Sequence, residues 1–214
     1  MSKPIMKQLI ALAALLTFAA IAAPAQTRAV REESPKEVVE QFWTMESTGG
    51  RLTPAGWYKA AVFFAVQPSP LPMDKDILVV AGDFRVGEPT ISGDQATVAV
   101  GCPGCRDLGH LDSTLRLKLS PLRPARASAH AMPGTSYKYD LVLSDKRWEV
   151  DPRTGVAQEL TGPRQWRLST FQPTLFLNVD TAIRYVTEMR TKWHDPAIRS
   201  NADATLAVLQ KWQR

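Results

Sequence analysis

The sequence is poor in the residues that metal and catalytic sites most often use. Three of its 214 residues are histidines: His110, His130 and His194. No two of them stand at a metal-ligand spacing, and the chain carries neither a Ser-His-Asp order nor a glycine-rich phosphate loop. We therefore expect no metal site and no cofactor.

Long apolar runs are also lacking, except at the N-terminus. Residues 9–23 form an uncharged apolar run, which follows Lys3 and Lys7 and ends at the Ala-Pro-Ala of residues 23–25. Basic residues, an apolar run and a small-residue cleavage site together make a secretory signal peptide. The alternative is an uncleaved anchor, but the run is shorter than the roughly 20 apolar residues of a spanning helix. The sequence predicts a signal peptide over residues 1–25 and a periplasmic or extracellular protein without a membrane anchor.

The excess of positive charge is small. Removing residues 1–25 takes away two lysines and no acid, so the basic residues fall from 26 to 24 against 21 acidic ones, and the net charge falls from +5 to +3. Such a balance is ordinary for a soluble domain and does not predict a nucleic-acid partner.

Helix signals follow a flexible leader expected at residues 26–34. Residues 34–37, Ser-Pro-Lys-Glu, combine a capping serine, a proline at the first helical position and a capping-box glutamate. Apolar residues then recur at helical spacing as far as the glycines at 49–50. Residues 53–54, Thr-Pro, repeat the signal and open a second helix with one apolar face.

Alternating apolar and polar residues then predict strands. We expect them at residues 77–86, 95–102, 111–119, 137–143 and 148–151. Residues 120–136 are expected to form a long loop, and residues 144–147, Ser-Asp-Lys-Arg, a tight turn. Helices followed by hairpin-connected strands favour an α+β fold, with the helices packed on the concave side of a curved antiparallel sheet.

A C-terminal extension, residues 153–214, follows the domain expected at residues 35–152. After an irregular segment come two helical patterns, at residues 180–193 and 196–212, each with one apolar stripe that ends in tryptophan. The link between them is short, so we expect a helical hairpin. Short helices depend on burying their apolar face; this hairpin would pack on the domain's own sheet or on a second copy in a homodimer.

Three stretches carry a family resemblance: SPKEVVEQFWTMESTGG (34–50), VGEPTISGDQATVAV (86–100) and YDLVLSDKRWEVD (139–151). They resemble the opening helix, a hairpin and the final hairpin of the nuclear-transport-factor-2-like superfamily, which has a cone-shaped, cystatin-like α+β fold. The resemblance covers about residues 35–152 and implies a cone-shaped cavity. Because the superfamily includes isomerases, polyketide cyclases and dehydratases as well as binding domains without catalysis, the fold assigns no reaction.

The only two cysteines, Cys102 and Cys105, form a Cys-x-x-Cys pair. Haem attachment needs histidine directly after the second cysteine, where Arg106 stands. A thioredoxin-type site needs a helix N-terminus, but a strand pattern resumes at Leu111. We favour a structural disulfide that closes a hairpin loop in an oxidising compartment, with free thiols, a redox role and a metal role as alternatives.

Five aromatic side chains are candidates for lining a ligand pocket, with core packing as the alternative: Trp43, Trp57, Tyr137, Tyr139 and Trp148. The candidates for acid–base chemistry are Asp83, Asp140, Tyr58 and Tyr139, although Asp140 lies on the opposite strand face from Tyr139. Arg123 and Arg126 could meet an anion.

We hypothesise an exported, non-catalytic binding module that takes a small apolar ligand or a partner protein at the mouth of the cone. The first alternative is an enzyme resembling ketosteroid isomerases or polyketide cyclases. The second is a thiol-disulfide protein acting through Cys102 and Cys105. A buried acid with a hydrogen-bonding partner beside the cavity would favour catalysis, and an apolar cavity would favour binding.

Overall fold

The computed structural model of the chain describes residues 32–67, 76–111, 117–124, 131–132, 136–171 and 174–213. The chain divides into two units, Met1–Glu32 and Glu33–Arg214, and the described fold belongs to the second. It is α+β, as predicted, with four α-helices and two sheets among the described residues. The expected signal peptide, and residues 26–31 of the expected leader, lie outside the described residues.

The helices are α2 (Pro35–Ser47), α3 (Pro54–Ala60), α4 (Val179–Lys192) and α5 (Pro196–Trp212), with a 3-10 turn, η1 (Ala61–Phe63), after α3. The predicted capping box of α2 is confirmed: the Ser34 hydroxyl accepts from the Glu37 N–H, and the Glu37 carboxylate accepts from the Ser34 N–H. Thr53 caps α3 through a single bond, in which its hydroxyl accepts from the Gly56 N–H at 3.1 Å. These caps pair N–H groups that have no partner inside their helix.

Two sheets contain the strands. Sheet A has the order β10 (Thr174–Leu177), β1 (Asp76–Val80), β5 (Arg106–Leu111) and β6 (Leu117–Pro124). Sheet B has the order β2 (Arg85–Val86), β4 (Gln95–Gly101), β8 (Ser136–Val150) and β7 (Ala131–Met132), with β3 (Thr90–Ser92) also paired to β4 and β9 (Ala157–Leu168) paired to β8. The pairing of β1 with β10 is parallel, whereas the other pairs are antiparallel.

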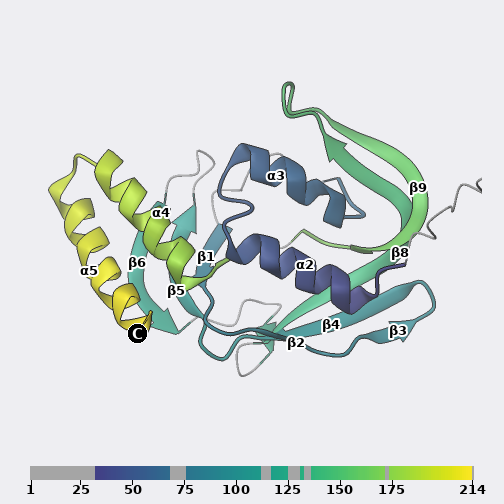
Figure 1. Cartoon of the computed structure of the whole chain (residues 1–214), viewed down its shortest axis with the longest axis horizontal. Coiled ribbons are helices and arrows are strands. Elements are labelled where there is room, and N and C mark those ends of the chain that lie inside the picture. The colour runs from purple at the N-terminus through teal and green to yellow at the C-terminus, as the bar shows by residue number, and fades with distance from the viewer. Residues whose placement is uncertain are drawn as a thin grey trace, which may run out of the picture. The chain divides into compact units, whose positions relative to one another are not determined.

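Sheet A is covered on both faces. Leu78 of β1 and Leu175 of β10 belong to a hydrophobic core with α4 and α5, which lie against this sheet in Figure 1. The neighbouring residues, Val79 and Phe176, belong to a second core with α2 and sheet B. Successive side chains of a strand point to opposite faces, so β1 and β10 contribute to both cores.

Helices α4 and α5 are joined by residues 193–195 and contact each other through an ion pair between Arg190 and Asp203. Four residues fully buried in one core come from the two helices: Ala182, Val186, Ala202 and Leu209. The predicted stripes are buried only in part, because Ile198 is 40% exposed and Trp212 is 38% exposed. No helix among the described residues is long and apolar enough to cross a membrane.

The turn predicted at residues 144–147 is wrong. These residues continue β8, in which Lys146 pairs with Thr161 of β9, and the chain reverses only after Val150. Charged residues suit an exposed strand as well as a turn when they have partners, and Lys146 Nζ lies 2.9 Å from a carboxylate oxygen of Glu159 on β9. The segment predicted to be irregular after residue 152 therefore contains a strand of sheet B.

Three other predicted boundaries differ from the structure. The strand expected at 77–86 is interrupted after Val80, because the chain then leaves sheet A, through the buried Ala81, and forms β2 in sheet B. The strand expected at 111–119 is divided between β5 and β6, and residues 112–116 lie outside the described residues. The loop expected at 120–136 contains the end of β6 and the short strand β7, because backbone pairing outweighs the proline-rich composition there.

Candidate functional site

Four of the five proposed pocket aromatics are buried in hydrophobic cores: Trp43, Trp57, Tyr137 and Tyr139. Trp43 stacks on Phe176 of β10 with the ring centroids 4.1 Å apart, and it also packs against both tyrosines. Trp148 is half-buried on β8, and its indole N–H donates to the Ala65 carbonyl at 3.3 Å. The structure thus brings three of the five together, Trp43, Tyr137 and Tyr139, in a packed aromatic cluster.

A buried ion pair joins the end of α2 to the connection between α2 and α3. Arg51 Nε and Nη2 donate to the two carboxylate oxygens of Glu46 at 2.6 Å and 2.7 Å, and both side chains are at most 1% exposed. Arg51 Nη2 also donates to the Thr174 carbonyl of β10 at 2.9 Å. The pair therefore ties α2, the α2–α3 connection and sheet A together.

Three aromatic rings enclose the Arg51 guanidinium. Its Cζ lies 4.9 Å from the ring centroid of Trp57 and 5.4 Å from those of Phe42 and Phe171. Cation–π attraction and the bidentate carboxylate offset the cost of burying this charge. Glu46, whose two oxygens both accept from Arg51, is therefore not free to act as a general base.

Sequence reasoning missed this pair, although a signal was present. Glu46 follows Val39, Phe42 and Trp43 at three- and four-residue spacing, which places it on the apolar face of α2. A charged residue on a buried helix face needs a partner of opposite charge. That requirement points to a nearby basic residue but does not identify Arg51 among those available.

Burial alters the two cluster tyrosines in the same direction. It raises the pKa of Tyr137 to about 12, with a smaller contribution from the negative charge of Asp107. It also raises the pKa of Tyr139, where the Glu46 carboxylate adds to the effect. A hydroxyl with a raised pKa is a weaker proton donor, so neither tyrosine is prepared for acid–base catalysis near neutral pH.

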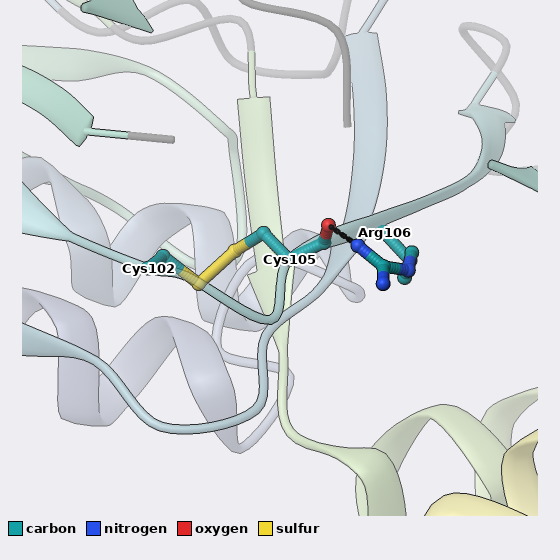
Figure 2. The surroundings of a disulfide bond; sticks show 3 residues. All are labelled: Cys102, Cys105 and Arg106. Carbon is teal, nitrogen blue, oxygen red and sulfur yellow. Dashed lines mark hydrogen bonds between the residues drawn. A yellow bond between two sulfur atoms is a disulfide. The ribbon is translucent and has the colours of Figure 1, made fainter. Parts of the chain in front are cut away.

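Cys102 and Cys105 form the disulfide that Figure 2 shows. Its S–S distance is 2.01 Å, and both residues are fully buried. Arg106 Nη1 donates to the Cys105 carbonyl at 3.3 Å. The expected hairpin is wrong: the strand before the disulfide, β4, belongs to sheet B, and the strand after it, β5, belongs to sheet A. The two strands find different partners, so the bond closes a turn that passes from one sheet to the other.

The other acid–base candidates are not gathered into a site. Asp83 and Asp140 are exposed, and Tyr58 is half-buried. Asp140 accepts from Thr97 Oγ1 at 2.9 Å and pairs with Lys138 at 3.1 Å, on the strand face opposite Tyr139, as predicted. Arg126 and the side chain of Arg123 lie outside what the structure describes.

Open space occurs instead along α2, in two pockets that share Gln41 and Phe63. The first, here named the α2 groove, has a volume of about 500 Å³ and is lined by Glu37, Glu40, Gln41, Thr44, Met45, Thr48 and Phe63. The second, here named the Arg167 pocket, has a volume of about 330 Å³, and its walls include Gln41, Val62, Phe63, Arg147, Trp166 and Arg167. The two are neighbouring pockets, and their walls come from α2, η1, β8 and β9.

A third pocket, of about 370 Å³, lies where α4 meets the α2–α3 connection. Its walls include Thr48, Leu52, Arg184, Tyr185, Met189 and Lys192. Its lining mixes charges of both signs, since Glu188 also contributes. Sequence reasoning missed all three pockets: the Arg167 pocket and the third pocket are formed by segments that are distant along the chain, and the α2 groove depends on how Phe63 packs beside α2.

Among the described residues, no three His, Cys, Asp or Glu side chains gather as metal ligands would. Comparison of the chain with protein-family models, with curated proteins and with solved structures finds no match in any of the three.

Proposed function

We propose that this protein is an exported, non-catalytic binding module for a small apolar ligand, which it holds in the α2 groove. The observation that carries the proposal is the contrast between interior and surface. Inside, Glu46 is closed on Arg51 and the aromatic rings pack on one another. On the surface, Phe63 and Met45 line an open groove of about 500 Å³, within the volume range of small-molecule sites.

Export rests on the N-terminal signal pattern and on the disulfide. Disulfides persist in oxidising compartments such as the periplasm or the extracellular space, and Cys102 and Cys105 are joined in the described fold. The resemblance to nuclear-transport-factor-2-like domains remains part of the proposal. In that reading α2 covers a cone formed by sheet B, and α4 and α5 act as a helical hairpin that covers sheet A.

Both alternatives are less well supported. An enzyme of the isomerase or cyclase kind needs a free acid or base beside a cavity, and Glu46, the buried acid of this region, is fully paired. A thiol-disulfide protein needs an accessible sulfur, and both cysteines are fully buried.

The experiment begins with a thermal-shift screen of the mature protein against lipophiles and metabolites. Each ligand that binds is then tested against Thr44→Arg, which places a long charged side chain in the groove. The matched control is Thr187→Arg on α4: both threonines are exposed, and each donates its hydroxyl to the carbonyl four residues earlier.

The proposal expects a ligand whose binding is lost in Thr44→Arg and kept in Thr187→Arg, and which mass spectrometry recovers unchanged after incubation. Chemical conversion of the ligand by the folded protein would instead establish the enzyme. Equal binding by both arginine variants would place the ligand elsewhere.

A further inference from the structure

Arg167 is a buried cation at the end of β9. The residue is 8% exposed and lines the Arg167 pocket. Its Nη1 donates to the Val62 carbonyl, and its Nη2 donates to Gln165 Oε1 at 2.8 Å. Both acceptors are neutral, so the hydrogen bonds orient the guanidinium without balancing its charge.

The remaining nitrogen of this guanidinium has no partner. Arg167 Nε is buried and makes no hydrogen bond, and among the described residues no carboxylate lies within ion-pair distance of the side chain. Burial lowers the pKa of Arg167 and the nearby Arg147 lowers it further, while the negative charge of Glu33 opposes part of that shift. A buried charge without a counterion is costly, and a bound anion would remove that cost.

The charges around the pocket limit the kind of anion. Arg147 adds a second guanidinium and Glu33 adds one carboxylate, so the walls carry a net charge of about +1 with Arg167 included. Arg147 Nη2 pairs with Glu149 at 2.9 Å, and Glu33 accepts from Gln41 Nε2 at 3.0 Å. With Arg147 paired to Glu149, Arg167 is the guanidinium of this pocket that has no ion-pair partner among the described residues, so a single negative charge is the best match.

The charge changes sign between the two pockets. The Arg167 pocket is lined by two guanidinium groups and one carboxylate, Glu33, whereas the charged groups that line the α2 groove, Glu37 and Glu40, are both carboxylates. Phe63 belongs to both pockets and provides apolar surface between them. A ligand with one negative end and an apolar body would therefore bind in one direction, with its charge at Arg167.

We propose that the Arg167 pocket binds the carboxylate of an apolar monocarboxylic acid whose hydrocarbon part lies along Phe63 in the α2 groove. This inference deepens the proposed function by naming the ligand class, and it rests on that function for the position of the hydrocarbon part. Arg167 lines the pocket, and each of its terminal nitrogens carries a second N–H besides the one that Val62 or Gln165 accepts. These N–H groups can donate to a carboxylate oxygen, and charge-assisted hydrogen bonds of this kind are strong.

The test compares three probes on the full mature chain: decanoate, 1-decanol and acetate. Trp166 lines the pocket, so its fluorescence reports binding, and calorimetry gives the affinity. We expect decanoate to bind about 10- to 100-fold more tightly than decanol, because a hydrogen bond to a charged group contributes that much. Acetate should compete only at high concentration, since it lacks the apolar part.

Three variants test whether Arg167 and Glu33 determine the affinity for decanoate. Arg167→Met should make decanoate bind no better than decanol, and Arg167→Lys should weaken decanoate while keeping the charge. Glu33→Gln should tighten decanoate binding several-fold, because it removes the one acid of the pocket wall. The matched control is Arg164→Met: Arg164 lies on the same strand, is exposed and pairs with Asp94 at 2.6 Å, and the change should leave decanoate binding as it is.

The outcomes separate the two proposals. Equal binding of decanoate and decanol, both lost in Thr44→Arg, would overturn the anion site and leave the apolar groove in place. If none of the three probes binds, the proposal of a monocarboxylate ligand is overturned. The library screen then tests independently whether the α2 groove binds an apolar ligand. If Arg167→Met does not fold, the other two variants decide. If Arg167→Lys and Glu33→Gln both bind decanoate with the affinity of the parent protein, the inference is overturned.

Discussion

Arg51 donates two hydrogen bonds, of 2.6 Å and 2.7 Å, to the Glu46 carboxylate, and aromatic rings surround its guanidinium. Both side chains are at most 1% exposed to solvent. The pair joins the end of α2 to the connection that leads into α3, and each buried charge is compensated by the other.

Removing one member of this pair should therefore destabilise the fold strongly. Arg51→Met leaves the Glu46 carboxylate buried without a counterion, and we expect a loss of about 3–5 kcal/mol in the free energy of unfolding, measured by urea denaturation. Glu46→Gln with Arg51→Met removes both charges and should recover a large part of that loss. A double variant as unstable as the single one would show that packing, rather than charge, dominates the position.

The disulfide should contribute modestly to stability. Cys102→Ala with Cys105→Ala opens a very short loop, so we expect a loss of about 2 kcal/mol in the free energy of unfolding, with helix and sheet content preserved in circular dichroism. Because both sulfurs are buried, dithiothreitol should reduce the native protein slowly and the urea-unfolded protein quickly. Fast reduction of the native protein, together with insulin-reductase activity, would instead support a thiol-disulfide role.

Helix α5 should belong to the folded core rather than form a dispensable tail. Leu209 is fully buried, and Leu209→Ala should lower the free energy of unfolding by about 2–5 kcal/mol. Its neighbour Val208 is 37% exposed, so Val208→Ala should change stability by less than about 0.5 kcal/mol. Truncation after Asn178 should cause aggregation, since it uncovers the leucines of sheet A. A truncated chain that stays folded and monomeric would contradict this reading.

Stability should fall at alkaline pH because of the two cluster tyrosines. Burial raises the pKa of Tyr137 to about 12, above the value of about 10 in the unfolded chain. The folded protein then holds a proton that the unfolded chain has lost, so the stabilisation is complete below pH 10 and is lost as the pH rises towards 12. Each such tyrosine adds a slope of about 1.4 kcal/mol per pH unit. In urea titrations at pH 9 to 12, Tyr137→Phe should lessen the slope, and an unchanged slope would contradict the assignment.

Local signals in the sequence predict helix starts well. Ser34 and Glu37 form the predicted capping box because both groups lie within one turn of each other. Strand boundaries depend on partners elsewhere in the chain, and they are predicted less well: Lys146 belongs to a strand because Thr161 pairs with it. The arrangement of the two sheets around Cys102 and Cys105 could not be predicted either, because a periodic pattern indicates where a strand is but not which strands pair with it.

The candidate site was predicted even less well, for a related reason. The aromatic residues could be named in advance because their size alone marks them for burial or binding. Arg167 stands between Trp166 and Leu168, and the alternation of a strand places it on the face opposite to theirs, so nothing nearby in sequence says that it is buried. Its burial follows from Val62, whose carbonyl accepts from it across more than a hundred residues of chain.

The parallel pairing of β1 with β10 has a consequence for the order of events during synthesis. Ile77 pairs with Thr174, so β1 leaves the ribosome long before its partner strand exists. Until then, Leu78 and Val80 lack both β10 and the helices that follow it. Such late, non-local pairing slows folding and leaves apolar strand surface exposed in the nascent chain. Sheet A can therefore be completed only after the residues of β10 have been synthesised.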